Sequence, residues 1–295
     1  MQKPDWIAVD WGTSNMRAWA MTSGGTVLAD VRSDQGMGGL APDAFAPALR
    51  QAIAGWDHTE VPIIACGMVG ARQGWIEAPY AATPCTATPD GFTKPDAGDL
   101  DVHIIAGVMQ ANPADVMRGE ETQIAGFLAR NKNWDGVICL PGTHTKWVHI
   151  SADEIVSFQT YMTGDLFAAI AGHTVLRHSV TADGWDDSAF DAGVADAMDR
   201  PERLAARLFS LRAEGLLNAM PNAAARARLS GLLIGAELAG AKPYWIGQQI
   251  AVIGAGGLSA LYVRALAAQS APATQVKGDA ITLAGLTAAY RRLKG

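Results

Sequence analysis

Apolar and polar positions alternate in short runs through the first third of the chain, and the runs are separated by residues that favour turns. Gly24-Gly25 is a typical turn between two such runs. The pattern predicts the following elements in chain order: strands over 6–11, 16–21 and 26–32, a helix over about 43–55, strands over 61–66 and 102–107, and a helix over about 114–130.

The pattern of the opening residues recurs in the second half. Residues 137–150 read VICLPGTHTKWVHI, which is again an apolar strand, a Gly-Thr turn and an alternating strand, and a third strand follows over 154–162. Gly142 and Thr143 follow Gly12 and Thr13 at an offset of 142 − 12 = 130 residues. Hairpins of this kind also arise by chance, but the repeat of all three strands favours a duplicated domain.

The remaining residues favour helices. Residues 184–228 indicate a helical insertion, 227–241 a strongly apolar helix, and 250–257 a strand that runs into a glycine turn, with a helix from 258. An alanine-rich helix over 280–293 ends in basic residues, which suits its dipole. Strands and helices mixed in both halves predict an α/β fold.

Composition limits the classes of partner. The chain has 295 residues, of which 49% are hydrophobic and 18% charged, with a formal net charge of −6. This charge argues against nucleic acid or an anionic membrane as a partner, but an anionic small substrate needs only a few local cations. Cys66, Cys85 and Cys139 are widely spaced, so we expect neither disulfides nor a zinc site. With a strand expected from Trp6 and no room for a leader, we expect a cytoplasmic protein without membrane spans.

The first turn carries chemistry. Asp10 ends the first apolar run and is followed by Gly12, Thr13, Ser14 and Asn15. Such a turn presents backbone N–H groups and hydroxyls on one side, which suits phosphate oxygens. A carboxylate would repel phosphate, so Asp10 suits a metal ion that bridges phosphates. The alternative is an aspartate that bonds the amides of its own turn.

These motifs resemble those of the sugar kinase / heat-shock protein 70 / actin superfamily. Asp-x-Gly-Thr-Ser resembles its first phosphate loop, PGTHT (141–145) its second, and VIGAGGLSAL (252–261) its adenosine motif. The resemblance implies two ribonuclease-H-like domains with a nucleotide in the cleft between them. We expect the first domain over 1–113, with the final helix (280–295) packed on it, and the second over 114–279 with the helical insertion.

Six segments narrow the resemblance to the 2-dehydro-3-deoxygalactonokinase family. They are GMVGARQGWIEAPY (67–80), MRGEETQ (117–123), LPGTHTKWV (140–148), YMTGDLF (161–167), LFSLRAEGLL (208–217) and LSGLLIGAELAGA (229–241). The resemblance implies transfer of the ATP γ-phosphoryl group to the 6-hydroxyl of 2-dehydro-3-deoxy-D-galactonate, with Mg²⁺. It implies ATP or phosphate contacts from Gly12, Thr13, Ser14, Asn15, Gly142, Thr143, His144, Gly254, Gly256 and Gly257, with the metal at Asp10.

The reaction also needs a base for the sugar hydroxyl. The superfamily places an acid after a glycine and shortly before the second phosphate loop, where this chain has Gly119-Glu120-Glu121. The usual residue there is Asp, so one of the two glutamates replaces it. Adjacent helical residues point about 100° apart, so only one can face the site. We favour Glu120, which directly follows the glycine, and Glu121 then stabilises the helix dipole.

A sugar acid needs a cation for its carboxylate. Arg72 lies in GARQGW, where related kinases place sugar contacts, and Gln73 and Trp75 are candidates for hydroxyl bonding and stacking. Arg17 and Lys146 follow the phosphate loops and are the other candidate cations. The alternatives are core packing for Trp75 and surface ion pairing for Arg72.

Other functions fit less well. VIGAGGLSAL also imitates a dinucleotide-binding turn, but Ser259 stands at the third glycine position. In addition, the motif begins at Gly254, and we expect no room after it for the remaining βαβ units of such a domain. The Walker motif GxxxxGK[ST] is absent from the sequence. A kinase for another keto-deoxy sugar acid or sugar, and a non-catalytic sugar or nucleotide sensor on the same fold, stay open. The sequence gives no oligomeric state.

Overall fold

The computed structural model describes residues 3–180 and 183–295, which divide into two units. Unit 1 comprises residues 1–135, 150–158 and 278–295, and unit 2 comprises 136–149 and 159–277. The boundary expected after residue 113 therefore falls inside unit 1. The physical reason is that the residues just after it pair and pack within unit 1, as described below.

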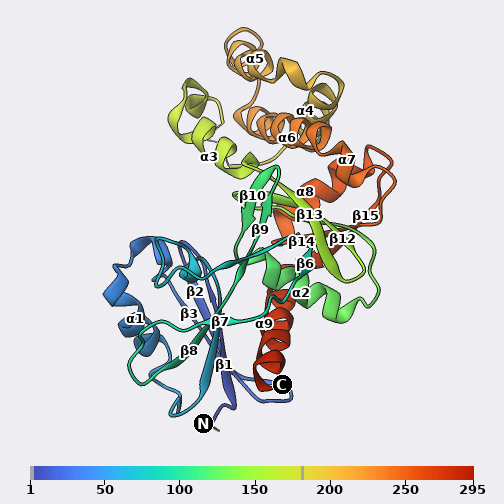
Figure 1. Cartoon of the computed structure of the whole chain (residues 1–295). Helices are drawn as coiled ribbons and strands as arrows, with labels where there is room; N and C mark the ends of the chain where they lie inside the picture. The colour runs from blue at the N-terminus through green and yellow to red at the C-terminus, as the bar shows by residue number, and fades with distance from the viewer. Residues whose placement is uncertain (1–2, 181–182) are drawn as a thin grey trace. The chain divides into compact units, whose positions relative to one another are not determined.

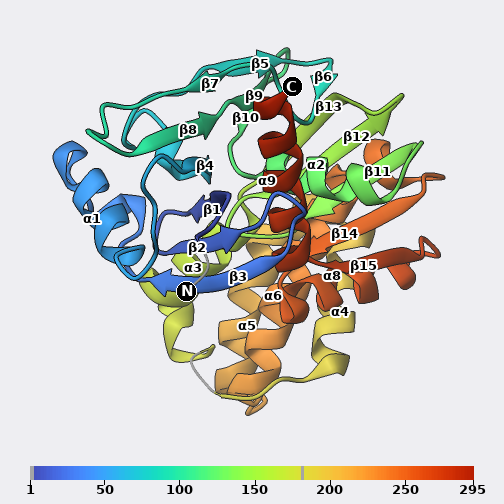
Figure 2. The same cartoon turned by 90° about the horizontal axis from the view of Figure 1, so that it is seen from below.

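The main sheet of unit 1, which Figure 1 shows from the side, has the strand order β3-β2-β1-β4-β8-β7, and the order from β3 to β8 can be followed in Figure 2. Its strands are β1 (Trp6–Trp11), β2 (Met16–Met21), β3 (Val27–Ser33), β4 (Pro62–Gly67), β7 (Phe92–Thr93) and β8 (Asp101–Ile105). The first three strands form an antiparallel meander, whereas β4 pairs parallel with both β1 and β8. The carboxyl ends of β1 and β4 therefore lie at the same edge.

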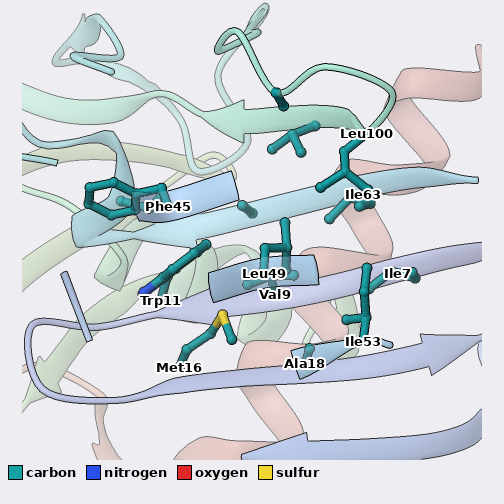
Figure 3. Packing of buried hydrophobic residues seen from close by; sticks show 14 of the residues in the cluster. Ile7, Val9, Trp11, Met16, Ala18, Phe45, Leu49, Ile53, Ile63 and Leu100 are labelled. Carbon is teal, nitrogen blue, oxygen red and sulfur yellow. The ribbon is translucent and has the colours of Figure 1, made fainter. Parts of the chain in front are cut away.

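Alternate residues of β1 point to opposite faces of this sheet. Ile7, Val9 and Trp11 pack against helix α1 (Phe45–Ala52), which supplies Phe45 and Leu49 to the same core (Figure 3). On the other face, Trp6 and Ala8 pack against α9 (Gly278–Lys294), which runs beside the sheet (Figure 2). Trp6 stacks on Tyr290 of α9, with ring centroids 4.6 Å apart. Asp10 has the even register of Trp6 and Ala8, so its side chain is directed to the α9 face.

A smaller sheet and a second helix complete unit 1. The sheet has the order β10-β9-β5, from β5 (Tyr80–Ala82), β9 (Gly107–Ala111) and β10 (Ala114–Met117), and β6 (Cys85–Thr86) pairs with the start of β13. Helix α2 (Glu120–Arg130) packs along α9. The helix expected from residue 114 therefore begins six residues later: residues 114–117 form a strand, and Gly119 at φ 106° precedes the helix.

The sheet of unit 2 contains β15-β14-β11-β12, followed by β13, and the division between the units passes through the β12–β13 hairpin. Its strands are β11 (Gly136–Leu140), β12 (Thr145–Ser151), β13 (Glu154–Tyr161), β14 (Ile250–Gly254) and β15 (Ala273–Lys277). Strand β14 pairs parallel with β11 and β15, so the ends of β11 and β14 lie at one edge.

Helices supply much of unit 2. They are α3 (Thr163–His173), α4 (Asp187–Asp199), α5 (Leu204–Leu217), α6 (Asn222–Gly240), α7 (Lys242–Trp245) and α8 (Gly256–Ala267). Helix α6 lies beside α4 and α5 (Figure 1). Phe190 of α4, Leu238 of α6 and Tyr262 of α8 pack with Trp147 of β12 in one buried core. The apolar helix expected over 227–241 is thus the later part of α6.

Short 3₁₀ helices connect several of these elements. They are η1 (Met37–Gly39), η2 (Pro42–Ala44), η3 (Met68–Gly70), η4 (Val175–His178) and η5 (Pro201–Arg203). The predicted fold class, two α/β domains with a helical insertion in the second, is confirmed. The pattern did not predict α3, β15 or the short strands of unit 1.

Candidate functional site

The first Gly-Thr loop joins β1 to β2 at the sheet edge of unit 1. The Gly12 N–H donates to the Asn15 carbonyl at 2.9 Å, which closes the turn, and Thr13, Ser14 and Asn15 are exposed. The segment after β3 returns under this loop: Gly38 N–H donates to the Thr13 carbonyl at 2.8 Å. A Cβ on Gly36 would lie 2.2 Å from the Ser14 carbonyl carbon, so only glycine fits there. Thr13 and Ser14 also line a cavity of about 560 Å³ with residues 34–36 and 38–40.

The second Gly-Thr loop, between β11 and β12 in unit 2, is supported in the same way. The segment after its third strand, β13, returns under the loop, and Asp165 N–H donates to the Thr143 carbonyl at 3.0 Å. A Cβ on Gly164 would lie 2.4 Å from the Gly142 carbonyl oxygen. His144 bonds Asp165 through Nε2 at 2.8 Å, which supplies an orienting acid that the sequence alone did not reveal.

The two loops therefore share a supporting device as well as a sequence motif. In each case three strands are followed by a glycine whose backbone touches the loop between the first two strands. Gly36 stands 24 residues after Gly12 and Gly164 stands 22 residues after Gly142. This correspondence supports the duplication inferred from the strand pattern.

The adenosine-like motif lies beside the second loop. Gly254 ends β14, and Gly256 and Gly257 open α8, where backbone N–H groups at the helix start are exposed. A Cβ on Gly254 would lie 3.5 Å from the Pro141 carbonyl oxygen, so the two motifs are adjacent within unit 2. The parallel pairing of β11 with β14 causes this adjacency.

A cavity of about 430 Å³ opens next to these motifs. Its lining includes Gly142 and Thr143 of the loop, and Leu258 and Tyr262 of α8. The helical segments add a further set of lining residues: Phe167, Trp185, Arg226 and Leu233. The Arg226 guanidinium lies 5.1 Å from the centroid of the Phe167 ring, a cation–π contact in the wall. Trp185 and Arg226 belong to the helical insertion, whereas Phe167 and Leu233 stand in two of the quoted segments. The sequence assigned none of them to a site, because it does not show which helices form one cavity.

Asp10 lies in an ion-paired group on the α9 face of unit 1. Arg17 donates to Asp10 Oδ2 at 2.8 Å and to Asp279 Oδ1, in the first turn of α9, at 2.5 Å. The other oxygen of Asp10 is 3.9 Å from Cys66 Sγ. Asp10 thus bonds an arginine, and Arg17, a candidate cation for the substrate carboxylate, bonds two carboxylates of this protein.

The turn before α2 brings Glu120 and Glu121 to the end of β4, beside Asp10. A Cβ on Gly119 would lie 3.3 Å from Gly67 Cα, and one on Gly67 would lie 3.6 Å from Asp10 Oδ1. Residues more than 100 positions apart in the sequence therefore meet at the ends of β1 and β4. Burial raises the pKa of the Cys66 thiol, and the charges of Asp10 and Glu121 raise it further.

Glu121 is buried and Glu120 is not. Glu121 is 1% exposed, accepts a hydrogen bond from Gly119 N–H at 2.6 Å through Oε2, and accepts one from the Thr122 hydroxyl at 3.1 Å through Oε1. Burial raises the pKa of Glu121 to about 7, and the adjacent Glu120 adds to the rise. Glu120 is half-buried and accepts from Arg118 N–H at 3.1 Å. Only Glu120 is therefore accessible to a substrate.

The three candidates in GARQGW have different surroundings. Arg72 is exposed and its Nε donates to Glu77 at 3.2 Å, and Gln73 is also exposed. Trp75 is half-buried and lies over Phe45, with ring centroids 5.9 Å apart, at the edge of the α1-side core. Trp75 therefore anchors the loop that carries Arg72 and Gln73, as the core-packing alternative expected.

Lys146 differs from the other candidate cations because it is inside unit 2. Its side chain is 5% exposed, and its Nζ donates to the Thr160 hydroxyl of β13 at 2.9 Å. It follows Thr145 on β12, immediately after the second Gly-Thr loop.

Two α/β units with matched Gly-Thr loops, and an adenosine-like glycine turn beside the second, define a protein of the sugar kinase / heat-shock protein 70 / actin class. The solved structure of an activator of 2-hydroxyisocaproyl-CoA dehydratase from Clostridium difficile has this fold at 13% identity, with a TM-score of 0.52 over 98% of this chain and 95% of that one.

Within this class, the chain belongs to the 2-keto-3-deoxy-galactonokinase family, whose model matches residues 10–289. A relative from Rhizobium meliloti (strain 1021), named "Probable 2-dehydro-3-deoxygalactonokinase DgoK1", is 41% identical over 98% of this chain and 97% of its own length. The 2-dehydro-3-deoxygalactonokinase of Escherichia coli (strain K12) is 34% identical over 95% and 96%.

A crystal structure from Sinorhizobium meliloti, assigned to the same activity, has a TM-score of 0.91 at 40% identity and covers 98% of this chain and 99% of that one. Every helix within residues 3–180 and 183–295 is too short or too polar to span a bilayer.

The supporting glycines predict the outcome of a simple substitution series. Gly36→Ala and Gly164→Ala place a methyl group against loop backbone, so each should lower the free energy of unfolding by about 1–3 kcal/mol and raise KM for ATP at least tenfold. Urea unfolding and steady-state kinetics measure both effects.

Gly55→Ala and Gly172→Ala are the matched controls, because a Cβ at either position meets nothing within 4 Å. They should stay within about 0.5 kcal/mol of the parent. If Gly36→Ala and Gly164→Ala have the same free energy of unfolding and the same KM for ATP as the two controls, these glycines do not support the loops.

The buried Glu121 predicts a pH dependence of stability. Its pKa is raised in the folded state, so the folded protein binds the proton more tightly, and stability falls as pH rises from about 4.5 to about 7. The shift from 4.5 to about 7 corresponds to about 3 kcal/mol. Between pH 5 and pH 8, the free energy of unfolding of the parent should therefore fall by up to that much more than the free energy of unfolding of Glu121→Gln. Urea unfolding at each pH measures both values.

Glu237, whose pKa is raised in the same direction, is present in both proteins and cancels in this comparison. Parallel stability curves for parent and variant would show that Glu121 is ionised throughout.

Proposed function

We propose that this protein transfers the γ-phosphoryl group of ATP to the 6-hydroxyl of 2-dehydro-3-deoxy-D-galactonate. Family membership along nearly the whole chain supports the reaction and the substrate class. The structural observation that carries the proposal is the meeting of Asp10 and the Gly119-Glu120 turn in unit 1. A phosphoryl transfer to a hydroxyl needs an acid for the metal and a base for the hydroxyl, and Asp10 and Glu120 are our candidates for these two roles.

Unit 2 receives the nucleotide in this proposal. The cavity beside α8 has room for an adenine ring and an apolar wall to hold it, with Leu258 from α8 and the Phe167–Arg226 pair from the helices. Gly256 and Gly257 let the chain approach the ribose and phosphates closely. Gly142, Thr143 and His144 then contact phosphate oxygens, and Thr13, Ser14 and Asn15 do so from the first loop.

Asp10 is the residue that fits Mg²⁺. No group of three or more metal-ligating side chains occurs within the described residues, so protein atoms alone do not form a magnesium cage there. Mg²⁺ with nucleotides commonly takes one or two carboxylates, with phosphate oxygens and waters as its other ligands. Asp10 Oδ1, which does not bond Arg17, is the oxygen suited to this role. When bound, Mg²⁺ neutralises charge on the phosphates.

Glu120 is the proposed base. Its carboxylate takes the proton of the sugar 6-hydroxyl as that oxygen bonds the γ-phosphorus, and the bond between the γ-phosphorus and the bridging oxygen breaks to release ADP. Glu121 stabilises the turn instead, because both its oxygens already accept hydrogen bonds, one from Gly119 and one from Thr122.

Arg72 is the proposed partner of the substrate carboxylate. Its present partner, Glu77, is a surface carboxylate, and such pairs contribute little to stability, so the guanidinium can exchange it for a substrate at small cost. Gln73 is placed next to it for a substrate hydroxyl. Arg17 and Lys146 already bond Asp10 and Thr160, and each follows a Gly-Thr loop. We therefore assign them to the phosphates of the nucleotide and not to the sugar acid.

Cysteines 66, 85 and 139 are free thiols, as expected in a reducing compartment. We therefore include a cytoplasmic location in the proposal.

A coupled assay of ADP release tests the function directly. The purified chain, ATP and Mg²⁺ are combined in turn with 2-dehydro-3-deoxygalactonate, its C4 epimer from gluconate, and free hexoses. We expect the highest kcat/KM with the galactonate derivative. A higher kcat/KM with the epimer or a hexose would reassign the substrate, and no release with any of them would refute the kinase.

Substituting each glutamate in turn tests which of the two is the base. Glu120→Gln should lower kcat at least about 100-fold while KM for ATP changes less than threefold, because the nucleotide contacts are elsewhere. Glu121→Gln, the matched control, should lose less than tenfold in kcat. If neither variant loses more than tenfold, the base is not in this turn.

Arg72→Gln should raise KM for the sugar acid about tenfold or more, the value of one charged hydrogen bond of about 1.5–3 kcal/mol, without changing KM for ATP. Arg200→Gln is a suitable control, since Arg200 is another exposed arginine beside a carboxylate, Asp199, at 3.5 Å. Equal KM values for the sugar acid in the two variants would remove Arg72 from the site.

A further inference from the structure

A carboxylate is buried directly beneath the nucleotide motifs of unit 2. Glu237 on α6 is 3% exposed, and it accepts hydrogen bonds from Trp147 Nε1 at 2.7 Å and from Tyr262 Oη at 2.7 Å. The Thr163 hydroxyl also donates to it. One side chain therefore joins α6 to β12, to α8 and to the start of α3.

Each donor belongs to an element that holds a nucleotide motif. Trp147 lies on β12, the strand that leaves the second Gly-Thr loop, and Thr163 directly precedes Gly164, the glycine beneath that loop. Tyr262 lies on α8 and also bonds the Thr145 hydroxyl at 2.9 Å, at the end of the loop. Thr163 and Tyr262 in addition line the 430 Å³ cavity. The network therefore surrounds the loop and reaches the cavity wall.

Burying this carboxylate is unfavourable. Desolvation raises the pKa of Glu237 to about 7 against the effect of its hydrogen bonds, which lower it. A residue of similar size without charge would pack in the same volume with no such cost. What a fully bonded polar network adds is a single fixed arrangement of the groups it joins. Here the network joins the second Gly-Thr loop, the start of α3 beneath that loop, and α8.

We propose that Glu237 is a positioning residue, which holds the second Gly-Thr loop and α8 in the arrangement that binds the nucleotide. The identity of that nucleotide as ATP rests on the proposed function. The residue itself touches neither ATP nor sugar acid, so its effect is confined to nucleotide affinity.

Glu237→Leu tests this role, because leucine keeps the approximate volume and removes both acceptors. We expect KM for ATP and the dissociation constant of ADP, measured by calorimetry, to rise at least tenfold, while KM for the sugar acid stays within twofold. Glu237→Gln keeps the shape and one acceptor oxygen, and should return both constants to within threefold of the parent.

Leu238→Ala is the matched control for simple core damage, since Leu238 is the next residue on α6 and is fully buried. It should lower the melting temperature without changing the affinity for ADP by more than twofold. A role in packing alone would make Glu237→Leu behave like Leu238→Ala, with a lower melting temperature and unchanged ADP affinity, and that result would overturn the proposal.

If Glu237→Leu does not fold, Trp147→Phe removes one donor at a position outside the cavity lining, and should raise the dissociation constant of ADP at least threefold. Unchanged ADP affinity in this variant would also overturn the proposal. The ADP measurement needs no sugar, so a parent protein that binds ADP but phosphorylates none of the sugar acids refutes the proposed function alone. A parent protein that does not bind ADP would refute both.

Discussion

The candidate chemistry in unit 1 depends on one close approach between two stretches of backbone, the end of β4 at Gly67 and the turn before α2 at Gly119. A side chain on Gly119 would lie 3.3 Å from Gly67 Cα, so α2 can begin at this place only because the contact is made without side chains. Gly119 also has φ 106°, which favours glycine. The approach sets the first turn of α2, with Glu120 and Glu121, beside the ends of β1 and β4. Asp10 is there because β1 pairs with β4.

The two faces of the sheet in unit 1 have different roles. The odd positions of β1 are apolar and form the core with α1, which leaves the even positions for the α9 side. Asp10 is the last even position of β1, so it is the one at the sheet edge, where its carboxylate remains partly accessible and bonds Arg17, which also bonds Asp279. This register is therefore the geometric reason why an acid ends an otherwise apolar strand.

Strand positions, the three motifs and the fold class were predictable because they rest on local pattern. Residues 6–11, 16–21 and 137–140 alternate or remain apolar over several residues, and the glycine turns follow at once. The helical pattern at 114–130 was misleading at its start, because residues 114–117 pair with β9 and tertiary pairing overrides a local preference. Helix α3 was missed because it follows a strand without a strong cap.

The candidate site was predictable only in part for the same reason. Its glycines and acids stand in recognisable motifs, whereas Gly36, Gly164 and Glu237 act through contacts with residues that are distant in sequence. A weak signal for the first two existed, since QGMGGL and TGD each follow the third strand of a repeat. Arg226 of the insertion and Phe167 of the YMTGDLF segment gave no sign of a shared cavity, because a wall formed by several helices has no motif of its own.

Hydrogen–deuterium exchange with a non-hydrolysable ATP analogue tests the proposed phosphate contacts of the two Gly-Thr loops most directly. We expect slower amide exchange at residues 12–15, at 142–144 and at the start of α8 when the analogue is bound. Protection at only one of the two loops, or at neither, would contradict the proposed contacts.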